Sequence, residues 1–182
     1  AFEMRSWDVT KIITVTIPVF GTTSRTKSNA VQLCEALGIT LKTVDITELS
    51  LKEFEAIEHD KDEHSVTYEN VQARARTSIL MNMANKEGGL VIGTGDLSEI
   101  ALGWSTYNGD HMSMYALNSS IPKTLIKYVI EYYKSNESIA DIIDDILDTP
   151  ISPELLPHKD DEIVQETEEI VGPYELHDFF LY

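Results

Sequence analysis

The sequence has almost no cysteine and no long apolar run, and each absence excludes a class of protein. Cys34 is the single cysteine among 182 residues, so no disulfide framework can form within the chain, and this fits a reducing cytosol. No apolar run reaches the roughly 18 residues that a membrane-spanning helix needs. The stretch "AFEMRSWDVT" also lacks the basic start and apolar middle of a signal peptide. We therefore expect no membrane partner and a cytoplasmic location.

Basic residues are also scarce. The chain has 14 Lys and Arg against 31 Asp and Glu, a formal net charge of −17. A nucleic-acid partner would need a basic face, so none is expected. Any phosphate-bearing ligand would have to be held by a few local cations, backbone N–H groups and a metal ion. The acids are densest over residues 158–169, which we interpret as a solvated loop and helix face.

Neither the cysteine nor the histidines form a recognisable site. Cys34 lies at helical spacing from Val31 and Leu37, so we predict a core residue and not a nucleophile. The histidines are not spaced as metal ligands, and we expect surface or core positions for all five: His59, His64, His111, His158 and His177.

The hydrophobic pattern near the start predicts a strand–helix–strand unit. The β-branched run 11–18 ends at Pro18 and reads as a buried strand. Residues 28–38 have helical spacing and stop at Gly38, and 39–46 alternate like a second strand. This order implies a parallel pair with a right-handed crossover.

The rest of the chain continues the alternation of helices and strands. We predict a charged loop at 58–67, a buried strand at 90–92, a proline-punctuated loop at 148–157 and an apolar tail at 174–182 that docks on a core. Helices are predicted at 49–57, 68–89, 121–133 and 138–147, and a short one between the strand 90–92 and Gly103. In the helix 68–89 the side chains predicted to face inward are Val71, Ile79, Leu80 and Met83. The alternation and the length indicate one α/β domain.

The stretch "GTGDLSE", residues 93–99, follows the predicted strand 90–92. Ligands in α/β folds sit outside the carboxyl ends of the strands, and Gly93 and Gly95 would let the backbone turn there and approach a ligand. Asp96 and Glu99 are spaced as a capping box, a purely structural arrangement. Glu99 could instead be a hard oxygen ligand for Mg²⁺. The spacing alone does not choose between these interpretations.

A longer stretch carries a resemblance to a known family. Residues 91–115, "VIGTGDLSEIALGWSTYNGDHMSMY", followed by "IPKTL", resemble the NAD synthetase family, specifically the synthetase domain of bacterial glutamine-dependent enzymes. Supporting stretches in the family's order are "IPVFGTTSRTKSNA", "TYENVQARAR", "DTPISPELLP" and "GPYELHDFFLY".

The resemblance implies a fold and a reaction. The fold would be a doubly wound, mostly parallel sheet with helices on both faces, of the adenine nucleotide alpha hydrolase (ATP-pyrophosphatase) type. ATP would adenylate the nicotinate carboxylate of deamido-NAD and release pyrophosphate, and ammonia would then displace AMP. An amidase domain outside this chain would supply the ammonia from glutamine. A homo-oligomer, at least a dimer, is also implied.

The resemblance also implies roles for particular residues. Glu99 would bind Mg²⁺ and, with Lys123, support the transition state, and Asp110 is a weaker candidate for the deamido-NAD pocket. Without the resemblance, Lys123 would be interpreted as a surface lysine at a helix start and Trp104 as a core anchor. The implied ATP contacts are Thr94, Lys123 and Ser152, and the implied deamido-NAD contacts are Asn70, Arg74, Glu99, Trp104, Ser105, Thr106 and Tyr107.

One family motif has no counterpart in these residues. The phosphate-binding loop Ser-Gly-Gly-x-Asp-Ser is not found, so we expect residues 1–182 to be a partial synthetase domain without its N-terminal part and inactive alone. Two alternatives stay open: another ATP-pyrophosphatase, such as a GMP-synthetase-like or tRNA-modifying enzyme, or a non-catalytic nucleotide-binding or assembly module. The motif in the upstream gene sequence would favour the enzyme.

Overall fold

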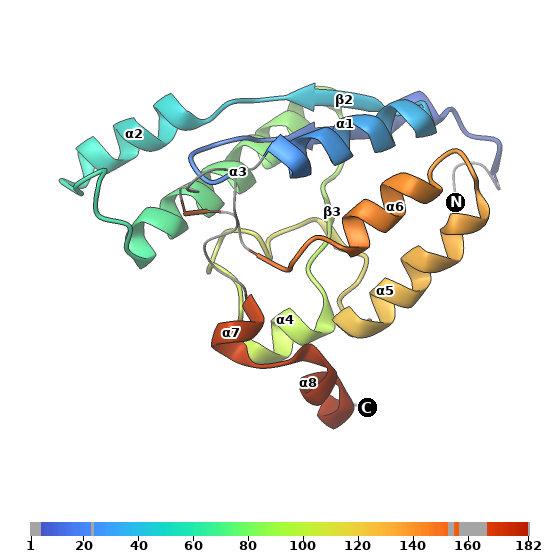
Figure 1. The fold of residues 1–182 in the computed structure, drawn as a ribbon. Helices are drawn as coiled ribbons and strands as arrows, with labels where there is room; N and C mark the ends of the chain where they lie inside the picture. The colour runs from blue at the N-terminus through green and yellow to red at the C-terminus, as the bar shows by residue number, and fades with distance from the viewer. Residues whose placement is uncertain (1–4, 23, 153–154, 157–166, 182) are drawn as a thin grey trace.

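The computed structural model describes residues 5–22, 24–152, 155–156 and 167–181, and over these it alternates helices with short parallel strands (Figure 1). None of the helices in these ranges is both long enough and apolar enough to cross a membrane.

The first strand–helix–strand unit is confirmed. β1 (Ile13–Thr16) and β2 (Thr40–Thr43) pair in parallel, with Ile13 opposite Thr40. α1 (Ser24–Leu37) connects them, and Gly38 follows it at φ +66°. This left-handed conformation suits glycine and ends the helix. The first strand is shorter than the predicted 11–18 and is not the buried strand that we predicted, since Ile13 is 36% exposed and the rest of β1 is half-buried. It begins later because Asp8 caps a 3₁₀ turn, η2 (Val9–Lys11).

The next two helices pack beside this unit. α2 (Thr47–Ala56) and the long α3 (Val66–Glu87) were both predicted. One core cluster joins Ile17 and Ile46 to Ala75 of α3, with Ile79 and Leu80 against it. Another joins Phe54, Tyr68 and Val71, and the rings of Phe54 and Tyr68 stack at 5.3 Å. Cys34 is buried beside Thr14, as expected for a core residue.

A second strand pair follows α3, and here one prediction was wrong. β3 (Ile92–Gly93) pairs in parallel with β4 (Tyr115–Ala116). We predicted a buried strand over 90–92, but Leu90 and Ile92 are 59% and 52% exposed. In the part of the chain that is described, β3 has β4 as its only strand partner. Its apolar side chains are therefore covered incompletely.

The two strand pairs are not hydrogen-bonded to each other within the described ranges, so these residues form two parallel pairs and not one continuous sheet. All pairings are nevertheless parallel and the connections helical, which fits the predicted fold class.

The remaining helices gather around α5 (Figure 1). α5 (Lys123–Tyr132), which runs into a 3₁₀ turn, η3 (Tyr133–Ser135), packs on α4 (Leu97–Leu102), α6 (Ala140–Leu147) and α8 (Tyr174–Leu181). The apolar tail docks through one face of α8 only: Tyr174 is buried, whereas Phe180 is 83% exposed. α7 (Thr167–Val171) precedes α8. Most of the predicted acidic stretch, including His158, lies outside the described residues.

Candidate functional site

The start of α4 is a complete capping box. The Glu99 backbone N–H donates to Asp96 Oδ1 at 2.9 Å, and the Asp96 backbone N–H donates to Glu99 Oε2 at 3.3 Å. The structural interpretation of this spacing is therefore confirmed. It leaves one carboxylate oxygen of each residue, Asp96 Oδ2 and Glu99 Oε1, for another partner.

The Lys123 ammonium forms ion pairs with both of those oxygens. Its Nζ lies 2.7 Å from Asp96 Oδ2 and 2.7 Å from Glu99 Oε1, and the Lys123 and Asp96 side chains are only 17% and 3% exposed. Lys123 is thus not the surface lysine that its position at a helix start would suggest. We call Asp96, Glu99 and Lys123 the lysine cluster.

The lysine cluster keeps its ammonium charge. Burial lowers the pKa of Lys123, but hydrogen bonds and charge attraction from Asp96 and Glu99 outweigh this and raise that pKa above its ordinary value. The ring of Tyr174 lies 5.3 Å below the ammonium, and burial raises the pKa of the Tyr174 hydroxyl to about 12. By formal charge, two carboxylates and one ammonium give the cluster a net charge of one negative.

A hydrogen-bond network supports the cluster from behind. The Lys123 backbone N–H donates to Ser98 Oγ at 2.9 Å, and the Ser98 hydroxyl donates to Asp178 Oδ1. Asp178 Oδ2 accepts from the Thr124 N–H at 2.9 Å and from the Thr124 hydroxyl at 2.7 Å. Sequence reasoning missed Ser98 and Asp178. An acid inside the apolar tail "YELHDFFLY" was the one available signal.

A second group of predicted residues comes together between α3 and the loop after α4. The Thr106 hydroxyl donates to Asn70 Oδ1 at 2.8 Å, and Arg74 Nε donates to the Tyr107 carbonyl at 3.1 Å. Asn70 and Arg74 are one turn apart on α3, so they share a face. We call Asn70, Arg74, Thr106 and Tyr107 the loop group.

The loop is folded by its own short-range contacts. The Thr106 N–H donates to Asp110 Oδ1 at 2.7 Å, and His111 Nδ1 lies 2.8 Å from the Thr106 carbonyl. A Cβ on Gly109 would lie 2.9 Å from Thr106 Cβ, so a side chain there would displace Thr106. Asp110, the weaker candidate, thus holds the loop that carries Thr106 and Tyr107.

The two groups lie at opposite ends of α4. That helix has six residues, about 9 Å of axial rise. The lysine cluster lies at its start, and the chain after Gly103 leads directly into Trp104 and the loop group. Gly103 has φ +65°, and the Trp104 N–H donates to the Glu99 carbonyl at 2.9 Å.

The other predicted contacts are placed less specifically. Thr94 follows β3, and its carbonyl accepts from Asn118 Nδ2 at 3.5 Å. Trp104 is half-buried, and Ser105 is exposed. Ser152 lies in the loop after α6.

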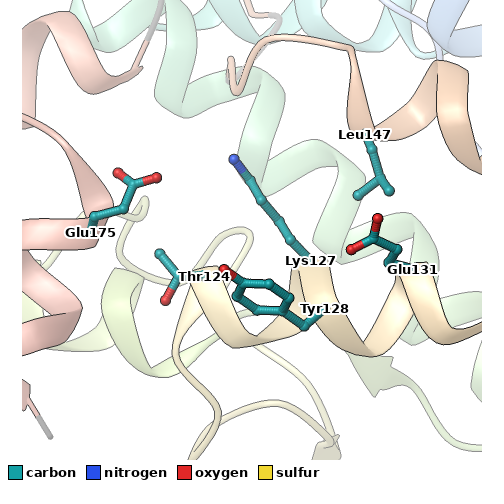
Figure 2. Close-up of a pocket in the computed structure, with 6 residues that line it drawn as sticks. All are labelled: Thr124, Lys127, Tyr128, Glu131, Leu147 and Glu175. Carbon is teal, nitrogen blue, oxygen red and sulfur yellow. The ribbon is translucent and has the colours of Figure 1, made fainter.

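Two hollows open beside α5. The larger, about 280 Å³, is drawn in Figure 2 and lies between α5, the end of α6 and α8. A second of about 230 Å³ shares Lys127 and Leu147 with it and extends to Thr149, Pro150 and Ile151. Neither is lined by a residue predicted to bind ATP or deamido-NAD. The larger hollow is lined by Thr124, Lys127, Tyr128, Glu131, Leu147 and Glu175.

No group of three or more His, Cys, Asp or Glu side chains suited to a metal ion occurs among the residues with described positions. A divalent cation at Glu99 would therefore need water and ligand oxygens to complete its coordination.

Parallel strands joined by helices define an α/β protein, and the lysine cluster lies just beyond the end of β3. The sequence model of the family described as NAD synthase matches residues 4–181. The chain therefore belongs to the NAD synthase family.

Individual relatives agree with this assignment. The glutamine-dependent NAD(+) synthetase of Mycobacterium leprae is 44% identical over 180 residues, 94% of this chain and 26% of the relative. The chain thus spans about a quarter of the length of the curated relatives it matches. NMN synthetase from Francisella tularensis superimposes with a TM-score of 0.79 at 24% identity, over 93% of this chain and 65% of that one.

A solved structure with a bound nucleotide is also similar. The glutamine-dependent NAD+ synthetase from Acinetobacter baumannii, in complex with ADP, has a TM-score of 0.69 at 26% identity, over 76% of this chain and 26% of that chain. The fold is that of solved NAD synthetases, the adenine nucleotide alpha hydrolase-like fold that the resemblance implied.

Proposed function

We propose that the protein containing this chain converts deamido-NAD to NAD by ATP-dependent amidation through an acyl-adenylate. The observation that carries the proposal is the lysine cluster: a shielded ammonium and two acids beyond a strand end, in a chain of the NAD synthase family. Relatives named glutamine-dependent NAD(+) synthetase support it. A carboxylate is a poor acyl donor, because it has no good leaving group. Adenylation attaches AMP to the acyl carbon, and AMP can then leave when ammonia attacks.

Lys123 is proposed to pair with ATP phosphate oxygens. The chain is strongly acidic, so the polyphosphate needs a local cation. The ammonium is held on two sides by carboxylates and beneath by the Tyr174 ring. A cation fixed in this way is already oriented before the ligand arrives, which favours stabilisation of charge that develops during the reaction.

Glu99 is proposed to bind Mg²⁺. Its donor type fits, because carboxylate oxygens are the ligands that Mg²⁺ prefers, with one or two acids, water and phosphate oxygens completing the octahedron. Both Glu99 oxygens already accept, from the Asp96 N–H and from Lys123 Nζ, so the ion would share Glu99 Oε1 with Lys123 or displace it. The net negative charge of the cluster also attracts a cation. The capping box fixes Glu99 through the Asp96 N–H, so its carboxylate is positioned by the helix start. When bound, the ion would neutralise charge on the phosphates.

The loop group is proposed to hold deamido-NAD. An amide, a hydroxyl and a guanidinium from two segments converge there, and such groups bind carboxylate or phosphate oxygens. Tyr107 is 75% exposed, so its ring is available for stacking on a base or pyridine. Trp104 and Ser105 at the end of α4 are assigned to the same ligand, and Thr94 and Ser152 to ATP.

Several wider assignments rest on the relatives and the sequence alone. Ammonia would come from glutamine through an amidase domain, as the names of the relatives suggest, and the protein would work as a homo-oligomer in the cytoplasm. Residues 1–182 by themselves are expected to be a partial, inactive synthetase domain, because they contain no Ser-Gly-Gly-x-Asp-Ser motif.

The test is product analysis with the gene product that contains these residues. With ATP, Mg²⁺, deamido-NAD and ammonium, the proposal expects NAD, AMP and pyrophosphate in equal amounts. ADP and phosphate as products, or NAD formation without ATP, would contradict it. AMP formation only with xanthosine monophosphate or tRNA would favour another ATP-pyrophosphatase. ATP binding without turnover would favour a non-catalytic module.

A further inference from the structure

α8 reaches the lysine cluster although it lies more than 50 residues along the chain from Lys123: Asp178 and Thr124 are 54 residues apart. Tyr174 and Asp178 are one turn apart on α8 and face the same way. Their exposed fractions are 2% and 6%, although Phe179 and Phe180 beside them are largely exposed. The buried face of α8 therefore presents a ring under the Lys123 ammonium and a carboxylate that accepts from the Thr124 backbone N–H.

Asp178 supplies a cap that α5 lacks locally. The residue before α5 is Pro122, which makes no side-chain capping bond. Proline has no N–H and no side-chain acceptor, so the first N–H groups of α5 need acceptors from elsewhere. The Thr124 N–H finds Asp178 Oδ2, and the Lys123 N–H finds Ser98 Oγ. A negative charge at a helix N-terminus is also favourable.

Ser98 links α4 to the start of α5 and to α8 by hydrogen bonds. It belongs to α4, is completely buried, accepts from the Lys123 N–H and donates to Asp178. The start of α4, which orients Asp96 and Glu99, is thereby fixed to the start of α5, which orients Lys123. Burial alone would raise the pKa of Asp178, but hydrogen bonds from Ser98 and Thr124 stabilise its charged form and hold that pKa below the ordinary value.

We infer that Asp178, acting through Ser98 and the first turn of α5, is a positioning residue for Lys123 in ATP binding. The inference rests on the proposed function for the role of Lys123. Asp178 touches no reacting group itself. Its removal should let the backbone at Lys123 move, so that the ammonium no longer meets the phosphates at a fixed place. The loop group does not depend on this network and should keep its ligand.

The test compares Asp178→Asn with Glu175→Gln in the gene product that contains this chain. Both changes remove one charge from α8, but Glu175 is exposed. Asp178→Asn should raise the KM for ATP about tenfold, the loss of a charged hydrogen bond, and leave the KM for deamido-NAD within about twofold. Glu175→Gln should change neither. Equal changes in both constants for Asp178→Asn would overturn the inference, because they indicate a general structural defect.

A double-mutant cycle separates positioning from stability. In a Lys123→Ala background, Asp178→Asn should add less than about a twofold change in the KM for ATP, since the group it positions is gone. A full additional tenfold effect would contradict the inference. If Asp178→Asn does not fold, Ser98→Ala removes the other link and is expected to give the same split between the two substrates.

A ligand-free measurement distinguishes failure of the inference from failure of the proposed function. Hydrogen exchange at the Lys123 and Thr124 amides should be faster in Asp178→Asn and unchanged in Glu175→Gln. If exchange responds but Lys123→Ala leaves the KM for ATP unaltered, the assignment of Lys123 to ATP is wrong. If Lys123→Ala impairs ATP binding and Asp178→Asn does not, the positioning role is wrong.

Discussion

The lysine cluster and the loop group are built in opposite ways. In the cluster, Lys123 is mostly buried, is held by two carboxylates, and is connected to α4 and α8 through Ser98 and Asp178. In the loop group, Arg74 and Tyr107 are exposed, and the two helix–loop contacts are one side-chain pair and one bond to a carbonyl. One region is mostly buried and held by several charged contacts, and the other is more exposed and joined to its helix by two hydrogen bonds.

This difference matches the chemistry proposed for each region. Phosphoryl groups are activated by charges that are already in place, because reorienting them during the reaction costs free energy. A dinucleotide is recognised over a larger surface, where loops and exposed side chains adapt to the ligand. Loss of Lys123, the shared partner of both acids, should therefore affect turnover and stability together, and changes in the loop group should affect mainly ligand binding.

The largest effect is expected for Lys123→Met. It leaves Asp96, 3% exposed, as an uncompensated buried carboxylate beside Glu99, which should cost about 3 kcal/mol of unfolding free energy. Turnover should fall at least about a hundredfold. Urea unfolding and steady-state kinetics measure the two losses. The matched control is Lys127→Met, one turn along α5 and exposed, where stability should change by less than about 0.5 kcal/mol. Equal stability of the two variants would argue against a buried ion cluster.

Glu99→Gln should separate function from stability. Glutamine can still accept from the Asp96 N–H, so unfolding free energy should fall by about 1 kcal/mol or less. It no longer offers Mg²⁺ a charge, so turnover should fall roughly a hundredfold and not recover at saturating Mg²⁺. Glu55→Gln on the exposed face of α2 is the control. Full turnover with reduced stability would leave Glu99 with a structural role alone.

Some of this arrangement could be predicted from the sequence, and the reason is its local character. Glycines at helix ends, as at Gly38, and the three-residue spacing of Asp96 and Glu99 are encoded within a few residues. The paired strands β1 and β2 follow from alternation over neighbouring segments. The family resemblance then pointed to Lys123 and the loop residues as candidate ligand contacts.

The rest depends on contacts that no local pattern encodes. Ser98 and Asp178 are 80 residues apart, and Lys123 and Glu99 are 24 apart. β4 has two exposed residues and no periodicity to mark it. The exposure of Leu90 and Ile92 follows from which strands pair with β3. Tertiary packing therefore decides features that propensity and spacing leave open.

Asn70→Ala should have a moderate and selective effect. It removes the acceptor of the Thr106 hydroxyl and should raise the KM for deamido-NAD about tenfold, with the KM for ATP unchanged. Stability should fall by less than about 1 kcal/mol because the site is only partly buried. Ser78→Ala, at an exposed position of the same helix, is the control. A larger effect on ATP than on deamido-NAD would break the proposed division between the regions.

The smallest expected effect is a change in how the unfolding free energy depends on pH at acid pH, measured with and without the Asp178 carboxylate. Burial would raise the pKa of Asp178, but hydrogen bonds from Ser98 and Thr124 outweigh it and hold that pKa below its ordinary value of 3.8. A carboxyl with a depressed folded-state pKa contributes stability above its unfolded pKa and loses it as pH falls through the folded one. Unfolding free energy should thus decline below about pH 3.8, less steeply in Asp178→Asn. An identical slope in both proteins would show that Asp178 does not titrate in this way.

The proposed reaction requires a carboxylate oxygen of deamido-NAD to attack the α-phosphorus of ATP, and isotope transfer measures this step directly. Deamido-NAD with ¹⁸O in its nicotinate carboxylate is incubated with the gene product that contains this chain, ATP, Mg²⁺ and ammonium. A carboxylate oxygen attacks the α-phosphorus and pyrophosphate leaves; ammonia then attacks the acyl carbon and AMP departs with that oxygen. One ¹⁸O is expected in AMP and none in pyrophosphate. Unlabelled AMP, or label in inorganic phosphate, would contradict the proposed reaction.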